Sequence, residues 1–182
     1  MSNPLLINAA ELLRRPGSDR RLVLQSTVAD LGIADRRFDP EATVSVSLRL
    51  ESLTDGIVVD GELRAPWADS CRRCLAPASG EVVAEVHELY QQTLTDPDAF
   101  EIIGDQFDLV PMIRENLLLD APIAPICRED CAGLCPNCGI DRNVATCDCL
   151  TAATDPRWDA LSQLKVNLPS IAATAAAPAN LL

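Results

Sequence analysis

The fold is decided by residues 43–50, which read Thr43-Val44-Ser45-Val46-Ser47-Leu48-Arg49-Leu50. Polar and apolar residues alternate along the whole stretch. Because successive side chains of a β-strand point to opposite faces, this alternation predicts a strand with one buried face and one face in water. Strands of that kind are typical of antiparallel sheets that are covered on one side only.

The segments around this strand predict its neighbours in the sheet. Thr54-Asp55-Gly56 indicates a hairpin turn, because Asp-Gly tolerates the positive φ of tight hairpins. The returning strand is expected over residues 57–65 and onward to Ser70, with further strands over 21–28 and 81–90 and a short one near 100–103. Residues 5–15 predict a short helix that Pro16-Gly17 ends.

One longer helix is expected over residues 108–119. Asp108 is a suitable N-cap, and Pro111 is tolerated in the first turn that follows it. One face of this helix is apolar, and it consists of Leu109, Met112, Ile113 and Leu117. Apolar residues off this face, Val110, Leu118 and Leu119, predict burial on most of the circumference. We therefore expect the helix to pack on the open face of the sheet.

The composition limits the kinds of partner that the chain can have. Its 182 residues carry a net charge of −12, so the chain repels nucleic acid and anionic membranes at long range. This charge excludes a general binder of the phosphate backbone. No apolar run approaches the roughly 20 residues of a membrane span, and the N-terminus has no signal-peptide pattern. We expect a cytoplasmic protein without membrane contact.

Eight cysteines in a reducing compartment indicate metal ligands rather than disulfides. Cys135-Pro136-Asn137-Cys138-Gly139 has the form of a metal knuckle, and Cys147 and Cys149 complete four soft ligands for a tetrahedral zinc ion. The other four, Cys71, Cys74, Cys127 and Cys131, then form a second site. In the alternative partition, Cys127, Cys131, Cys135 and Cys138 share one metal, and Cys147 and Cys149 join Cys71 and Cys74. We favour the first partition and expect one or two zinc ions.

These elements together predict an α+β protein. It would comprise a domain over residues 1–125, made of an antiparallel sheet or partial barrel with its packing helix, and a Cys-rich zinc lobe over 126–168 packed on it. The lobe would include a short helix that begins at Asp155. Residues 169–182 are rich in Ala and are expected to form a flexible tail.

Several motifs occur together and in order, and in combination they are specific. They are Cys71-x-x-Cys74-Leu75, Arg114-Glu115-Asn116-Leu117-Leu118-Leu119 before Pro122, Cys127-x-x-x-Cys131-x-Gly133-Leu134-Cys135-Pro136-x-Cys138-Gly139, Asn143, Cys147-x-Cys149 and Asp155-Pro156-Arg157. Over roughly residues 20–165 the chain resembles the YceD family, the bacterial large ribosomal RNA subunit accumulation proteins. The resemblance implies a role in synthesis, processing or stability of 23S ribosomal RNA, and it implies no enzymatic activity.

The partner implied by this role is a ribosome-assembly protein, an RNA-processing protein or structured rRNA. Arg72 and Arg73 would form a small basic spot for such a partner if the turn that carries them is exposed. A redox or metal-handling zinc protein is the alternative, because the basic residues of Cys71-Arg72-Arg73-Cys74 would lower a thiol pKa. His87, the only histidine, is interpreted as a polar-face strand residue.

Overall fold

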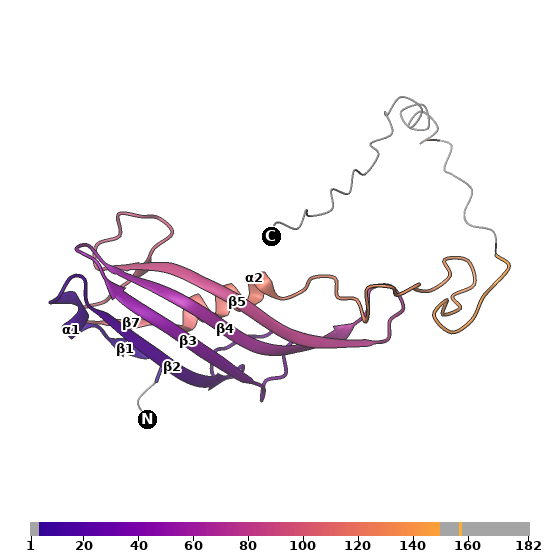
Figure 1. The fold of residues 1–182 in the computed structure, drawn as a ribbon, viewed down its shortest axis with the longest axis horizontal. Coiled ribbons are helices and arrows are strands. Elements are labelled where there is room, and N and C mark those ends of the chain that lie inside the picture. Colours follow the sequence, from indigo (N-terminus) through magenta and orange to yellow (C-terminus); the bar gives the residue numbers. More distant parts are fainter. Residues whose placement is uncertain (1–3, 150–156, 158–182) are drawn as a thin grey trace, which may run out of the picture. The chain divides into compact units, whose positions relative to one another are not determined.

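The computed structural model describes residues 4–149 and residue 157 of the chain (Figure 1). Its elements are, in order, β1 (Leu6–Asn8), α1 (Ala10–Leu13), β2 (Asp19–Thr27), β3 (Thr43–Ser52), β4 (Ile57–Ser70), β5 (Pro77–Gln91), β6 (Phe100–Glu101), β7 (Gln106–Asp108) and α2 (Val110–Asp120). The predicted α+β class is confirmed.

The main sheet has five strands in the order β2-β3-β4-β5-β6, and it is open. Its first four strands form an antiparallel meander, while the short β6 pairs parallel to the end of β5. A separate two-stranded sheet joins β1 to β7. The prediction of an antiparallel sheet is therefore correct for the four long strands.

The alternation in residues 43–50 appears in the structure as alternating burial. Val44, Val46, Leu48 and Leu50 are at most 3% exposed, whereas the polar residues between them are exposed. The hairpin after β3 is also confirmed, since the Leu53 N–H donates to the Gly56 carbonyl at 2.8 Å. The positive φ expected there is not found at Gly56. Glycine is required instead because a Cβ would lie 2.3 Å from the Tyr90 carbonyl oxygen.

Helix α2 packs against β4 and β5 and closes the core on one face of the sheet (Figure 1). Met112, Ile113 and Leu117 are fully buried, as the helical spacing predicts. The expected burial of most of the circumference is wrong, because Leu119 is 74% exposed. The N-cap is Leu109, which makes no side-chain cap hydrogen bond, rather than the predicted Asp108; the Asp108 Oδ1 lies one residue earlier and accepts the Val110 N–H at 2.9 Å.

Two short segments differ from the prediction. Residues 5–15 were expected to be one helix, but residues 6–8 form β1 and only Ala10–Leu13 is helical. No strand was expected at residues 106–108, and the helix was expected to begin at Asp108, but these residues form β7 and pair with β1. Each of these three-residue strands depends on pairing with the other, so the alternation of residues within either segment is too short to predict a strand.

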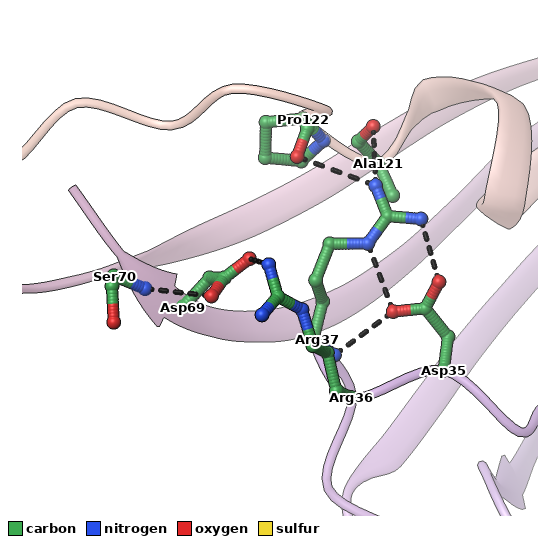
Figure 2. Close-up of polar contacts among 7 residues, drawn as sticks. All are labelled: Asp35, Arg36, Arg37, Asp69, Ser70, Ala121 and Pro122. Carbon is green, nitrogen blue, oxygen red and sulfur yellow. Dashed lines mark hydrogen bonds and ion pairs between the residues drawn. The ribbon is translucent and has the colours of Figure 1, made fainter. Parts of the chain in front are cut away.

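A guanidinium joins the loop after β2 to the end of α2 (Figure 2). The Arg37 side chain donates to both carboxylate oxygens of Asp35, at 2.9 and 2.7 Å, and to the carbonyl oxygens of Ala121 at 3.0 Å and Pro122 at 3.3 Å. Hydrogen bonds from Arg37 lower the pKa of Asp35 from 3.8 to about 2. The ion pair therefore stabilises the fold above about pH 4, and this contribution is lost as the pH falls through about 2.

The chain divides into two compact units, Met1–Leu134 and Cys135–Leu182. This division lies later than the boundary predicted after residue 125, because Cys127 and Cys131 group with cysteines that follow β4. The helix predicted from Asp155 and the tail predicted over 169–182 lie outside the described residues, apart from Arg157. Among the described residues, no helix is long and apolar enough to cross a membrane.

Candidate metal centres

Two turns of the first unit bring four cysteines together. Cys71 directly follows β4, and Cys74 lies in the turn before β5. Cys127 and Cys131 come from the segment after α2. The four sulfur atoms all lie within 4.8 Å of one another, and Cys71, Cys74 and Cys131 are buried. We call these four residues the first cysteine group.

The sulfur spacing in this group fits a tetrahedral metal ion. Cys71 Sγ and Cys131 Sγ are 3.9 Å apart, and Cys74 Sγ and Cys127 Sγ are 3.6 Å apart. A tetrahedron with Zn–S bonds of about 2.3 Å has edges of about 3.8 Å. A disulfide would need about 2.05 Å, so these are four free thiols. Four free thiols at this spacing could hold a metal ion.

Backbone amides lower the pKa of the Cys71 thiol, which favours the thiolate form that binds a cation. Burial raises the pKa of Cys71, but backbone N–H groups of Cys127, Arg73 and Cys74 outweigh this effect and lower it to about 6. One of these amides, that of Arg73, lies 3.4 Å from Cys71 Sγ. Burial raises the pKa of Cys127 to about 12. Because metals bind thiolates, the group begins with one ready anionic ligand, and a bound cation would favour the others.

Arg73 holds the two halves of the first cysteine group together. Its guanidinium donates to the carbonyl oxygens of Glu129 at 3.1 Å and Cys131 at 3.0 Å, and its own carbonyl accepts the Leu134 N–H at 2.9 Å. The structure thus gives Arg73 a positioning role that the sequence did not reveal. The only available signal was its place between the two cysteines of one motif.

Arg72 and Arg73 are both exposed, as the proposed basic spot requires. The Arg72 N–H donates to the Pro125 carbonyl at 2.9 Å, which fixes the backbone of the turn. Part of the Arg73 guanidinium already binds protein carbonyls, so Arg72 has the freer side chain for a partner. Contact of either arginine with RNA or protein stays a prediction.

Gly133 closes the first cysteine group, and we predict that it cannot be replaced without loss of metal affinity. It has φ +71°, and a Cβ there would lie 2.9 Å from the Arg73 carbonyl oxygen. Gly133→Ala should therefore cost about 2 kcal/mol, combining left-handed strain with displacement of Arg73. The expected result is a lower unfolding midpoint in urea and weaker retention of metal against a chelator.

The matched control for this change is Gly104→Ala. Gly104 has φ +61°, and a Cβ at this position would meet nothing within 4 Å. Gly104→Ala therefore introduces left-handed backbone strain but no close contact like the one with Arg73. It should lower stability by about 1 kcal/mol and leave metal retention unchanged. Equal metal retention in the two variants would show that Gly133 does not act through Arg73.

The second cysteine group lies within the second unit. It consists of Cys135, Cys138, Cys147 and Cys149, whose sulfurs also lie within 4.8 Å of one another. The Gly139 N–H donates to the Cys135 carbonyl at 2.9 Å, and Gly139 has φ +75°, as expected for a knuckle. Backbone N–H groups of Cys138 and Asn137 lower the pKa of Cys135 to about 6. Cys138 and Cys149 are exposed, so water reaches this group more readily than the first.

The two cysteine groups are those of the favoured partition, and the alternative partition is not the arrangement in the structure. His87 lies outside both groups. It is exposed on β5, where its Nδ1 lies 2.5 Å from Asp60 Oδ1 on the neighbouring strand β4. This is the polar-face position that the sequence predicts.

Comparison with known proteins agrees with the motifs. The family model described as large ribosomal RNA subunit accumulation protein YceD matches residues 59–165, which include all eight cysteines. An uncharacterized protein of Mycobacterium tuberculosis and one of Mycobacterium bovis are each 31% identical over 174 residues, covering 90% of this chain and 83% of the relative. An uncharacterized protein of Mycobacterium leprae is 31% identical over 147 residues, covering 75% and 67%. No solved structure matches. The chain belongs to the YceD family.

Proposed function

We propose that this chain is a non-enzymatic, cytoplasmic factor in the synthesis, processing or stability of 23S rRNA, and that each cysteine group binds one zinc ion. The single observation that carries the proposal is the pair of four-thiol groups, in a chain of a family described by large ribosomal RNA subunit accumulation. Zinc in such sites would maintain the shape of a surface that a partner recognises.

The donor sets support a structural role for the metal rather than a catalytic one. Catalytic zinc sites have three protein ligands and an open position for water or substrate. Here each group offers four sulfurs, which fill a tetrahedral ion and leave no position open. The pKa values of about 6 at Cys71 and Cys135 would serve to bind metal at neutral pH.

The proposed partner is a ribosome-assembly or RNA-processing protein, with structured rRNA as a further ligand over a small area. A net charge of −12 opposes extensive contact with phosphates. Direct RNA contact would have to be local, and exposed Arg72 is the residue we assign to it.

The test uses cells depleted of the native chain and complemented with variants, with the ratio of 23S to 16S rRNA as the measurement. Wild-type chain should restore the ratio, whereas a Cys74→Ser, Cys138→Ser double variant should not. Arg72→Glu should lower the ratio only if the basic spot contacts the partner. An unchanged ratio after depletion would contradict the proposed role, whatever the metal content.

A redox or metal-handling protein remains the rival, and one observation favours it. A thiol with a pKa of about 6, such as that of Cys71, is typical of reactive cysteines. The close sulfur pairs, however, join Cys71 to Cys131 and Cys74 to Cys127, rather than the two cysteines of one motif. Loss of function in Cys71→Ser with the metal content unchanged would favour the rival.

A further inference from the structure

An apolar groove lies between the two sheets of the first unit. Its cavity volume is about 400 Å³, within the roughly 300–1,000 Å³ typical of ligand pockets. The residues that line it come from β1, the end of β5, the β6–β7 region and the start of α2, and include Leu6, Tyr90, Phe100, Ile103, Phe107 and Pro111. These residues have no part in either cysteine group.

The floor of the groove is rigid and aromatic. The Tyr90 ring stacks on Phe100 with centroids 5.1 Å apart and packs against Phe107 at 4.6 Å. The Tyr90 hydroxyl donates to the Asp108 carbonyl at 3.2 Å, which ties the floor to β7. Tyr90 and Phe107 are nearly fully buried, so the shape does not depend on mobile side chains.

The rim exposes apolar side chains beside carboxylates. Ile103 is 74% exposed and Leu6 is 45% exposed, although both are large aliphatic residues. Glu101 and Asp108 also line the groove and are exposed. An apolar concavity with a polar rim is the form of a protein-binding site rather than of ordinary surface.

The two charged residues that line the groove, Glu101 and Asp108, are both acidic. Between Arg73 and Arg114 the chain has eight acidic residues and no Lys or Arg. Three of them, Glu101, Asp105 and Asp108, lie in or beside the segment that forms β6 and β7. A nucleic acid or anionic membrane would be repelled here, whereas a cationic segment would be attracted.

We infer that this groove binds a basic peptide segment of a partner protein, with an apolar side chain of the peptide inserted over Tyr90 and its Lys or Arg residues beside Glu101 and Asp108. The apolar floor supplies affinity, and the carboxylates select positive charge. This inference goes beyond the role in rRNA accumulation, and it would stand if that role failed, because its test contains no RNA.

The test measures binding of a short fluorescein-labelled peptide, in which Arg and Lys alternate with Leu and Phe, to the full chain by fluorescence anisotropy. The peptide should bind, and binding should weaken as salt is added. A version with Glu in place of the basic residues and one with Ser in place of Leu and Phe should each bind about tenfold more weakly or not at all.

Variants in the groove, each paired with a similar change outside it, test whether the peptide binds in the groove. Ile103→Asp should weaken binding about tenfold, whereas Val23→Asp, at an 80% exposed position on β2 outside the groove, should change it less than about twofold. Glu101→Lys should weaken binding more than Glu85→Lys, which makes the same charge change on the exposed side of β5.

Three results would overturn the inference. The first is equal binding of the acidic peptide, and the second is no binding of any of the three. The third is a sedimentation experiment in which the wild-type chain is a dimer and the Ile103→Asp variant is a monomer. The groove would then be occupied by a second copy of this chain.

Discussion

Cys131→Ser should lower the free energy of unfolding of the first unit by about 4 kcal/mol when a metal ion occupies the first cysteine group. Cys74 and Cys127 are 53 residues apart in sequence, and Cys71 and Cys131 are 60 apart. A covalent cross-link over a loop of that length stabilises by about 4 kcal/mol in the chain-entropy account, and a tightly held metal acts in the same way. Urea unfolding followed by circular dichroism at neutral pH measures the change.

The matched control is Cys147→Ser in the second cysteine group. That group spans only residues 135–149, all within the second unit. The variant should lose metal without changing the main unfolding transition of the sheet. If both variants lowered that transition equally, metal would stabilise the two units as one, and the separate assignment of the groups would be wrong.

Arg37→Leu is expected to destabilise the first unit strongly. Its side chain is only 14% exposed, and its loss removes the guanidinium bonds to Asp35 and to the carbonyl oxygen of Ala121, so Asp35 keeps only the backbone N–H of residue 37 (Figure 2). Removing one member of such a partly buried pair costs about 3 kcal/mol. The expected result is a lower urea midpoint, with weaker metal retention because the segment leading to Cys127 begins at the end of α2.

Arg36→Leu provides the comparison at the adjacent position. Arg36 is 83% exposed at its side chain and makes an ion pair with Asp69 at 3.1 Å (Figure 2). The Arg36 end of this pair lies in water, although the Asp69 side chain is only 10% exposed, so we expect a contribution of at most about 1 kcal/mol and a smaller shift of the midpoint than in Arg37→Leu. A loss of stability as large as that of Arg37→Leu would show that charge at this loop matters rather than the buried hydrogen bonds.

The long strands could be predicted because each one carries its own burial pattern. Residues 43–50 alternate strictly, and Met112, Ile113 and Leu117 recur at helical spacing, so local periodicity determines which faces are buried. β1 and β7 could not be predicted, since each is a three-residue strand that depends on its partner. Leu119 is exposed although it is apolar, because α2 has the sheet on one side only.

The cysteines that could bind metal were recognised from their spacing, but their grouping could not be decided from the sequence. In sequence, Cys127 and Cys131 could share a metal either with Cys71 and Cys74 or with Cys135 and Cys138. The choice depends on where α2 ends relative to the turn between β4 and β5, which is a tertiary fact. The roles of Arg37 and Arg73 in joining distant segments were hidden for the same reason, since the carbonyl oxygens that they bind at Ala121, Glu129 and Cys131 are far away in sequence.

The proposed function assigns one zinc ion to each cysteine group, and metal stoichiometry tests this assignment most directly. Native mass spectrometry of the full chain, purified without added metal or chelator, should find two zinc ions per chain. Cys74→Ser and Cys138→Ser should each remove one ion, and the double variant should remove both. A wild-type chain with no zinc, or with one ion that either single variant abolishes, would contradict the presence of two separate sites.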